Sequence, residues 1–522
     1  MGMRGLVSTS HALATGAGLA ILRAGGSAVD AAIAISATLA VVEPAMSGPG
    51  GCGYLLVHDA ASGRQHALDF MGRLPSQVPE WSADAFMTGA SGALVPGAVA
   101  GWVAAHARFG RLPFARLLDE PIDLAEHGVP LTARNADWAT RSQQRLLGDT
   151  RLTARYFSDS GAPAAGAVIR DPDLARTYRS IATDDGESFY RGALARTMVD
   201  FARAAAGTLS REDLATYEPR WETPLSLSYH GWTVLTAPPP SSGAQLLTTL
   251  GLLRGFPARA ARGDHEHLVL ECAKAAIADR GDRLRRDGGP ERVTLADDAA
   301  LDALRRGIRS DVAAPSEGDR AAHATARSFT TAFVVADGLG NLVASTQSLG
   351  QLFGGARTLG PTGVVINDFA WWTDPNGPIA YRAGARIESP LTPLLALGPA
   401  GELIALATPG SNAIMQILPQ AFVNLVDRGA TPADAIGAPR VISLGRHPYT
   451  DPWGEARPPT LIGAEDRVGD TTLDALRARG HVIEQLGPWS HAVGACAVVV
   501  RRASGVLDGA ADPRRDGTAA AW

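Results

Sequence analysis

The chain has 522 residues, of which 46% are hydrophobic and 19% charged, a composition typical of a folded globular protein and not of a disordered one. Its 48 basic and 53 acidic residues give a net charge of -5, which argues against nucleic-acid binding because phosphate neutralisation needs clustered basic side chains. A small molecule is therefore the expected binding partner.

The three cysteines, Cys52, Cys272 and Cys496, are far apart and odd in number, which argues against a disulfide framework and favours a reducing compartment. The first residues lack the apolar stretch and small-residue cleavage site of a secretory leader. No apolar run reaches the ~18 residues of a membrane span. We therefore expect a cytoplasmic protein that makes no membrane contact.

The first predicted elements are two Ala-rich helices over Ala12–Ala24 and Ala28–Val42, and the second is apolar enough to be buried on all sides. The other expected elements are strands at 54–58 and 65–70, mainly helices over 95–145, short helices over 163–206, a strand at 229–236, helices at 244–253 and 265–285, strands at 331–336, 342–348 and 403–407, and a helix at 413–427. Because strands and helices do not alternate strictly, we expect stacked layers of sheet and helix.

Two motifs before the predicted linker invite a cofactor or metal interpretation. The glycine-rich run from Gly48 to Gly53 matches GxGxxG, but it follows a helix and precedes a strand, the reverse of a dinucleotide site. A glycine loop packed close to an active site suits it better. His265 and His267 alternate on a predicted helix, so their rings point apart and we expect surface histidines. No cofactor and no metal are expected.

The most informative segment is the threonine-led hairpin from Thr330 to Asn341, which follows 310–328, a stretch poor in large apolar residues and the best linker of the chain. Threonines begin many strands without any chemical role. Cleavage between Phe329 and Thr330, however, would place a hydroxyl nucleophile and an α-amino base of pKa ~7.7–8 on one residue. The order of linker and hairpin is what a self-processing hydrolase needs.

A second candidate is the turn from Pro409 to Asn412, between a predicted strand and a long helix. Such a turn aims unpaired N–H groups at whatever lies before the helix, as an oxyanion hole requires. The alternative is an ordinary helix start capped by the side chain of Ser411 or Asn412. The two interpretations are compatible.

Blocks spread over the chain resemble those of the γ-glutamyltranspeptidases, of the N-terminal-nucleophile hydrolase superfamily. The blocks are 8–14, 25–32, 42–44, 47–51, 95–97, 238–243, 278–280, 330–341 and 511–514. The resemblance implies an α+β fold, the αββα four-layer sandwich, in which cleavage before Thr330 separates a large subunit, 1–329, from a small subunit, 330–522. Both subunits would form one domain. The resemblance leaves open whether the protein forms a homo-oligomer.

The resemblance also implies roles for individual residues. Thr330 is the expected nucleophile with its own amine as base. Ser348, where the family has a second threonine, is expected to hydrogen-bond that amine. The N–H groups of Gly410 and Ser411 are expected to hold the oxyanion, although the family usually has two glycines there.

The residues with which the family binds a glutamyl group are replaced in this chain. The arginine for the α-carboxylate falls at Met71, and of two paired serines only Ser389 remains. The contacts to the α-amino group fall at Gly350, Phe369 and Trp372, which offer no acceptor side chain. Burying an ammonium group without acceptors is costly, so free glutathione is a doubtful substrate.

Arg73 offers a replacement for the lost arginine. If residues 67–73 form one strand, Met71 and Arg73 leave the same face ~6.6 Å apart, and Arg73 could hold a carboxylate at a shifted depth. A surface ion pair is the alternative. With Phe369, Trp371 and Trp372 nearby, the pocket would suit a more apolar or planar acid.

Our first hypothesis is an autoprocessed hydrolase that cleaves a small carboxylate-bearing substrate through an acyl-enzyme, with water preferred to a second acceptor. Three substrate classes stay open: γ-glutamyl amides, oxamate-like amides, and a carbon–carbon bond beside an oxalyl group in a natural-product intermediate. The second hypothesis is a binding protein that never cuts itself, which intact Thr330-Thr331 argues against.

Overall fold

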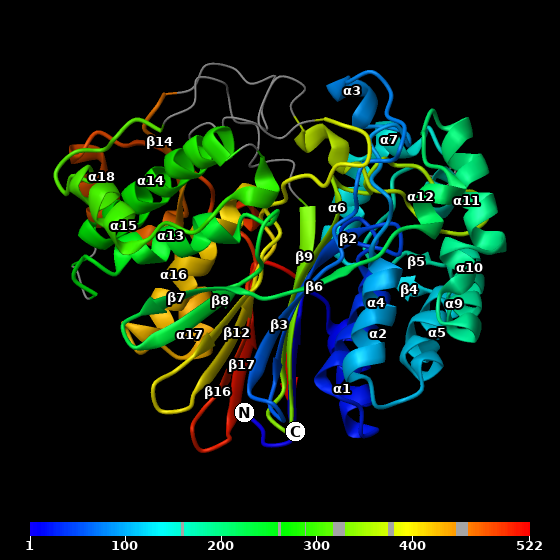
Figure 1. Cartoon of the computed structure of the whole chain (residues 1–522), viewed down its shortest axis with the longest axis horizontal. Coiled ribbons are helices and arrows are strands. Elements are labelled where there is room, and N and C mark those ends of the chain that lie inside the picture. The colour runs from blue at the N-terminus through cyan, green and yellow to red at the C-terminus, as the bar shows by residue number, and fades with distance from the viewer. Residues whose placement is uncertain are drawn as a thin grey trace.

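The computed structural model describes residues 1–157, 161–258, 261, 263–287, 289–316, 329–373, 381–444 and 458–522. Two sheets pack face to face, and helices cover the outer face of each (Figure 1). This confirms the expected αββα sandwich. Of the predicted linker, residues 317–328 lie outside the described residues.

The first sheet carries the predicted nucleophile. Its strands lie in the order β18 (Thr518–Ala521), β1 (Gly5–Thr9), β9 (Phe329–Asp337), β10 (Leu342–Gly350), β2 (Cys52–Asp59), β3 (Arg64–Asp69) and β6 (Arg220–Glu222). The second sheet has the order β17 (Leu507–Ala511), β16 (Ala497–Arg501), β12 (Leu403–Ala407), β11 (Leu394–Leu397), β8 (Trp232–Thr236) and β7 (Leu225–Tyr229). Smaller sheets join β13 (Val441–Ser443), β14 (Leu461–Ala464) and β15 (Val482–Gln485), and β4 (Val129–Pro130) with β5 (Val168–Ile169).

One helical layer covers the first sheet, on the right in Figure 1. It contains α1 (Ala12–Arg23), α2 (Ala28–Val42), α4 (Ala98–Phe109), α5 (Asp119–His127), α9 (Pro172–Asp184), α10 (Glu187–Tyr190), α11 (Ala193–Ala204) and α12 (Arg211–Ala215), with α3 (Ala83–Phe86), α6 (Ala133–Arg141), α7 (Gln143–Leu146) and α8 (Thr150–Tyr156) above. Helix α2 is buried along its whole length, as its all-round apolar sequence predicted.

The second helical layer covers the other sheet, on the left in Figure 1. It contains α13 (Gly243–Leu253), α14 (Asp264–Asp287), α15 (Asp298–Arg306), α16 (Ile414–Val426), α17 (Pro432–Gly437) and α18 (Asp470–Ala478). In the part of the chain that the structure describes, no helix combines the length and the apolar character needed to cross a bilayer.

Strand β7 is one of several strands that the sequence did not predict, although its residues carry a recognisable pattern. The predicted strand at 229–236 is the second half of a hairpin, β7–β8, that reverses at His230 and Gly231 with φ of 45° and 86°. Two consecutive positive φ angles are typical of a two-residue hairpin turn. The apolar–polar alternation of Leu225-Ser-Leu-Ser-Tyr229 was the available signal.

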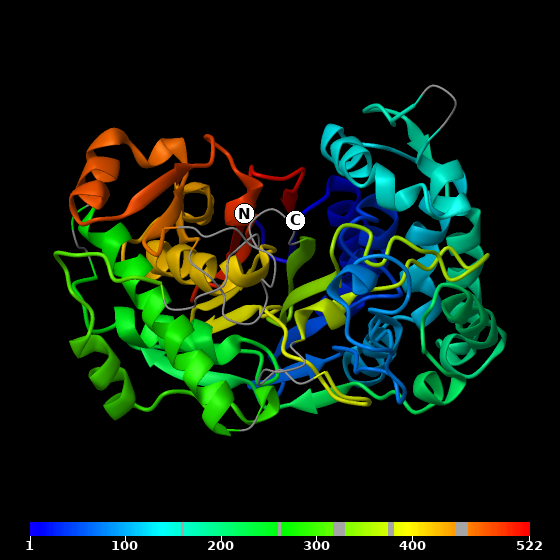
Figure 2. The same ribbon diagram turned by 90° about the horizontal axis from the view of Figure 1, so that it is seen from above.

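Strand register brings the predicted site residues to one end of the sandwich. Phe329 pairs with Gly350, Ser348 with Cys52, and Tyr54 with Asp69, so β9, β10, β2 and β3 all meet at that end. In the second sheet Ala407 pairs with Ala497, which pairs with Ala511. A Cβ on Gly517 would contact both Ala511 and Thr9, and Thr9 pairs with Phe333. The turn after β12 therefore emerges where β9 begins, as the views from the side and from above show (Figures 1 and 2).

Candidate active site

Thr330 is the second residue of β9 and is only 2% exposed. Side chains alternate along a strand, and Ala332 and Val334 belong to the apolar cluster between the two sheets. Thr330 therefore shares the face that looks toward the second sheet. Thr331 lies on the opposite face, toward the helices.

Ser348 is placed on the peptide bond that the sequence predicts to be cut. Its Oγ donates a hydrogen bond of 2.6 Å to the carbonyl oxygen of Phe329 and accepts one of 2.9 Å from the N–H of Gly350. A shift of register in β10 between Gln347 and Gly350 brings this hydroxyl to the edge of β9. A donor on this oxygen polarises the carbonyl and would stabilise negative charge developing there.

We predict that Ser348→Ala slows self-cleavage by ~10²–10³-fold, the usual effect of losing one donor to a developing oxyanion. Gel densitometry of freshly translated protein over time measures the rate. Ser345→Ala is the matched control, because Ser345 lies on the same strand but donates to the carbonyl of Tyr54. Equal cleavage rates in wild type and Ser348→Ala would remove Ser348 from this step.

The glycine-rich loop packs against the same strand, as the sequence predicted. A Cβ on Gly51 would lie 2.6 Å from the carbonyl oxygen of Ser348, and one on Gly50 would lie 2.1 Å from that of Val365. Real Cβ atoms do not approach backbone so closely, so only glycine fits here. The loop thus lets the chain lie directly against the residues that surround the cleavage site.

A buried polar cluster holds the chain on the C-terminal side of the nucleophile. Arg515 Nη1 donates to the carbonyl oxygen of Thr330 at 2.7 Å and lies 3.5 Å from Glu43. Ser10 Oγ donates to Glu43 at 2.9 Å, and the Ser10 and Thr331 hydroxyls are 2.6 Å apart. Burial raises the pKa of Glu43, whereas Arg515 lowers it. Ser10, Glu43 and Thr331 lie in blocks of the family resemblance, which assigned them no role in the site, and Arg515 lies outside those blocks.

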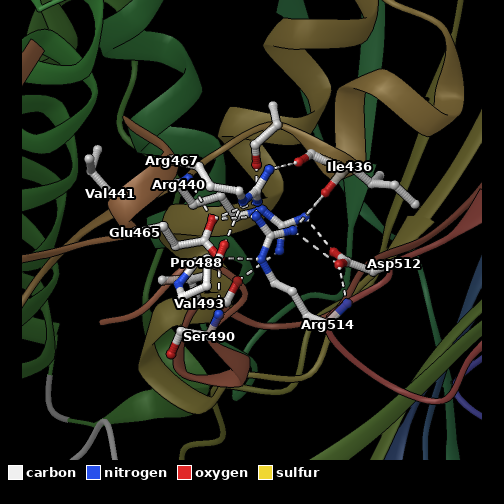
Figure 3. A network of polar contacts seen from close by, with 12 residues as sticks. Ile436, Arg440, Val441, Glu465, Arg467, Pro488, Ser490, Val493, Asp512 and Arg514 are labelled. Carbon is white, nitrogen blue, oxygen red and sulfur yellow. Dashed lines mark hydrogen bonds and ion pairs between the residues drawn. The ribbon is translucent and has the colours of Figure 1, made fainter. Parts of the chain in front are cut away.

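Arg515 is in turn positioned by an ion network in the small-subunit segment (Figure 3). Arg514 donates to Glu465 Oε1 at 2.8 Å and to Asp512 Oδ1 at 3.0 Å, and Arg440 donates to Asp512 Oδ2 at 2.6 Å. Both arginines also bind backbone carbonyls, Arg514 that of Ile436 at 2.9 Å. Because Arg514 and Arg515 are adjacent, the network fixes the segment that contacts Thr330.

The turn after β12 has the strained backbone expected of a functional loop. Gly410 has φ of 140° and Ser411 has φ of 53°, a region that residues with a side chain seldom adopt. Among the described residues, neither backbone N–H donates a hydrogen bond within the main chain. These are two free donors at the end of the sandwich where Thr330 lies.

The alternative interpretation of this turn as a side-chain helix cap is wrong. A short 3₁₀ segment, η4 (Ser411–Ala413), precedes α16, whose N-cap is Ala413 and makes no side-chain cap bond. The Ser411 hydroxyl is buried and has no hydrogen-bond partner among the residues that the structure describes. A buried hydroxyl without a partner is unfavourable, which agrees better with a ligand-facing role than with a capping role.

The replaced glutamyl-binding positions lie in apolar surroundings. Met71, Phe369 and Trp372 are buried in one hydrophobic cluster, the last two within η3 (Phe369–Trp372). Ser389 is fully buried, and its Oγ accepts a hydrogen bond from the N–H of Leu391 at 3.2 Å. The structure thus brings Met71, Phe369 and Trp372 into one apolar region.

The premise for Arg73 is wrong, because β3 ends at Asp69 and does not reach residue 73. Arg73 Nη2 donates to the Thr216 hydroxyl at 2.6 Å, on the residue that follows α12. A different arginine lies beside the strand end: Arg386 forms a buried ion pair with Asp69. Burial raises the pKa of Asp69 to about 6, although Arg386 favours its charged form.

Sequence comparison at the aligned positions missed a carboxylate next to Gly350. Asp368 lies so close that a Cβ on Gly350 would meet its Oδ1 at 2.1 Å. The carboxylate accepts two hydrogen bonds of 2.9 Å from Gln351 and lies 3.6 Å from Arg145. Burial raises the pKa of Asp368 to about 6. Arg145 already supplies the positive charge that an ammonium group would bring.

The expectation of surface histidines is wrong for His267, which is buried. Its Nδ1 lies 2.9 Å from His481 Nε2, and ligand atoms of His267, Glu271 and His481 lie within 4.8 Å of one another. Such a set resembles a metal site. Here Lys274 Nζ lies 2.7 Å from Glu271, so an ammonium group already balances that carboxylate.

This cluster holds the described start of the predicted linker. His267 contacts the carbonyl of Arg309 at 2.8 Å, and Lys274 donates to that of Ala314 at 2.9 Å. The N–H of Ala313 donates to the carbonyl of Arg479 at 2.7 Å. The described start of the predicted linker is therefore held by α14 and by Arg479, although its composition suggested a free linker.

Known proteins supply independent information on the chain. The family model described as Gamma-glutamyltranspeptidase matches residues 14–522. An Acylase ACY 1 proenzyme from Pseudomonas sp. (strain SE83) is 31% identical over 99% of this chain and 93% of its own length. An oxamate amidohydrolase proenzyme from Klebsiella pneumoniae is also 31% identical, over 99% of this chain and 98% of its own. The crystal structure of cephalosporin acylase from Bacillus halodurans superimposes with a TM-score of 0.87 at 29% identity, covering 100% of this chain and 96% of that one.

Proposed function

The chain belongs to the gamma-glutamyltranspeptidase family, and we propose that it is an autoprocessed amide hydrolase whose substrate carries a carboxylate but no α-amino group. The observation that supports this most directly is the hydrogen bond from Ser348 to the carbonyl of Phe329, next to buried Thr330. The proposed hydroxyl nucleophile and the polarised carbonyl thus belong to consecutive residues, Thr330 and Phe329.

Processing would proceed by attack of Thr330 Oγ on the carbonyl carbon of Phe329. The C–N bond of the peptide breaks, the α-amino group of Thr330 takes the proton of its hydroxyl, and an ester joins the two residues. Water then hydrolyses the ester and leaves a carboxylate on Phe329. The segments 1–329 and 330–522 become the large and small subunits.

Turnover would use the same hydroxyl. The freed amine of Thr330 takes the hydroxyl proton while Oγ attacks the substrate carbonyl, and the N–H groups of Gly410 and Ser411 stabilise the oxyanion. The amine leaving group departs with that proton, and water releases the acyl group from the ester. Ser348, held by Gly350, is placed to orient the amine after the cut.

The pocket argues against a γ-glutamyl group. Its ammonium would need an uncompensated acceptor, and Asp368 is already neutralised by Arg145 and occupied by Gln351. Apolar Met71, Phe369 and Trp372 favour a plain acid chain. Relatives named as an acylase and as an oxamate amidohydrolase match nearly the whole chain. Buried, unpaired cysteines agree with a cytoplasmic setting.

Four substrates distinguish the candidate substrate classes. Three are the p-nitroanilides of the γ-glutamyl, glutaryl and pentanoyl groups, and the fourth is oxamate itself. Glutaryl differs from γ-glutamyl only by the missing ammonium, and pentanoyl lacks the carboxylate as well. We expect the processed protein to hydrolyse the glutaryl anilide or oxamate at least tenfold faster, in kcat/KM, than the γ-glutamyl anilide. Preference for the γ-glutamyl anilide would contradict the proposed substrate, and one uncleaved band on a denaturing gel would contradict the mechanism.

A further inference from the structure

Several buried donor groups near Thr330 make no hydrogen bond in the described part of the protein. They are the Tyr54 hydroxyl, the Thr346 hydroxyl, Arg386 Nε and Trp372 Nε1. Leaving a buried polar group unpaired is costly, so such groups in a native fold call for an explanation. All four can donate, and arginine and tryptophan nitrogens can only donate. A ligand that satisfies them must therefore be an acceptor.

Strand register places three of these groups together. Thr346 pairs with Tyr54 across β10 and β2, and Tyr54 pairs with Asp69 across β2 and β3. Cross-strand partners share a face of the sheet. Asp69 forms the ion pair with Arg386, and the charges of Asp69 and Arg386 both act on the Tyr54 hydroxyl. Trp372 belongs to the same hydrophobic cluster as Tyr54.

The cross-strand partners Thr346, Tyr54 and Asp69 lie on the face of the sheet that carries Thr330. Thr346 also pairs with Ala332, two residues beyond Thr330 on β9. Two strand spacings sideways and two residues along give about 12 Å between the Cα atoms of Thr330 and Tyr54. A tyrosine side chain and a five-carbon acyl group can together span that distance.

We propose that Arg386 and Tyr54 bind the carboxylate end of the acyl group whose carbonyl Thr330 attacks. The proposal rests on the function proposed above. Asp69 occupies one side of the Arg386 guanidinium. Arg386 Nε lies 3.8 Å from the half-exposed Glu291 and makes no hydrogen bond among the described residues, so its N–H can still donate to a second anion. Met71, whose N–H donates to Asp69 at 2.8 Å, contributes apolar surface and no charge. Arg386 thus supplies the positive charge that position 71 lacks.

The test compares glutaryl and pentanoyl p-nitroanilides on processed protein. Tyr54→Phe removes a hydroxyl that makes no hydrogen bond to any described residue, so folding and self-cleavage should be unchanged. Its kcat/KM should fall about 10- to 100-fold for the glutaryl anilide, the range for losing a hydrogen bond to a charged group, and stay unchanged for the pentanoyl anilide. Arg386→Lys keeps a charge beside Asp69 but loses the fork, and should show the same selective loss.

Tyr178→Phe is the matched control, because Tyr178 is a buried tyrosine on α9 whose hydroxyl donates to the carbonyl of Ala37. It should leave kcat/KM unchanged for both the glutaryl and the pentanoyl anilide. Calorimetric titration with glutarate covers the case of slow turnover: wild type should bind and Tyr54→Phe should bind at least tenfold more weakly. Equal losses on both anilides, no loss in either variant, or no glutarate binding by cleaved wild type would overturn the inference. A selective loss in Arg73→Met instead would assign the anchor to Arg73. Wild type that stays uncleaved contradicts the proposed function itself, and the inference with it.

Discussion

Thr330→Ala will be recovered as one uncleaved chain and will hydrolyse none of the four test substrates. Alanine has no hydroxyl to attack the carbonyl of Phe329, so neither the cut nor the acyl-enzyme can form. The expected loss of turnover is complete within the detection limit, because the hydroxyl of Thr331, the next residue of β9, lies on the opposite face of the strand. Intact-mass spectrometry and the p-nitroanilide assay measure the two effects.

Thr330→Ser is the control for this variant, because it keeps a hydroxyl and differs from threonine by one methyl group. It should still cleave itself, at a changed rate, and give the subunits 1–329 and 330–522. A Thr330→Ala protein that is cut at the same bond would show that another residue is the nucleophile. Cleavage elsewhere would move the boundary between the two subunits.

Arg514→Met will destabilise the fold by about 3–5 kcal/mol, the usual effect of breaking a buried ion pair by removing one partner. Arg514 is fully buried, and the change leaves Glu465 and Asp512 each without one of their cations. Urea unfolding should be measured in the Thr330→Ala background, where the protein is one covalent chain. Arg514 also supports the segment that carries Arg515. When Arg514→Met is made in protein that keeps Thr330, self-cleavage should therefore be slower than in wild type.

Arg467→Met is the matched comparison, because Arg467 pairs with the same Glu465 at 3.1 Å but is partly exposed. Solvent-screened pairs contribute ~0–1 kcal/mol, so this variant should unfold within that margin of the parent. If both variants shift the unfolding midpoint equally, burial does not decide the strength of this network.

The sequence predicted those elements whose pattern is local. Helix α2 has no polar face, and the hairpin of β9 and β10 combines alternation with an Asp337-Gly338 turn, so both could be placed within two or three residues. Family blocks then fixed the layer order. Strand β7 was missed because His230-Gly231 was not identified as a turn with two positive φ angles.

The rest of the site depends on contacts between distant segments. Arg386 lies 317 positions from Asp69, and Arg515 lies 185 positions from Thr330, so no local spacing could reveal either pair. His267 was placed on the surface by helical alternation, which says nothing of His481 or of the segment 309–314 that covers it. Asp368 is adjacent in sequence to the aligned position Phe369 but is not itself an aligned contact position, so the family resemblance did not indicate it.

The order of the first sheet determines what processing does to the stability of the protein. Strands β9 and β10 come from the segment after residue 329, yet they lie between β1 and β2, which come from before it. If the chain is cut as proposed, neither subunit could leave without breaking a continuous ladder of hydrogen bonds. Refolding from the separated chains becomes a bimolecular reaction, which was unimolecular for the precursor. The mature enzyme would then persist because it unfolds slowly, and dilution should prevent recovery once it has unfolded.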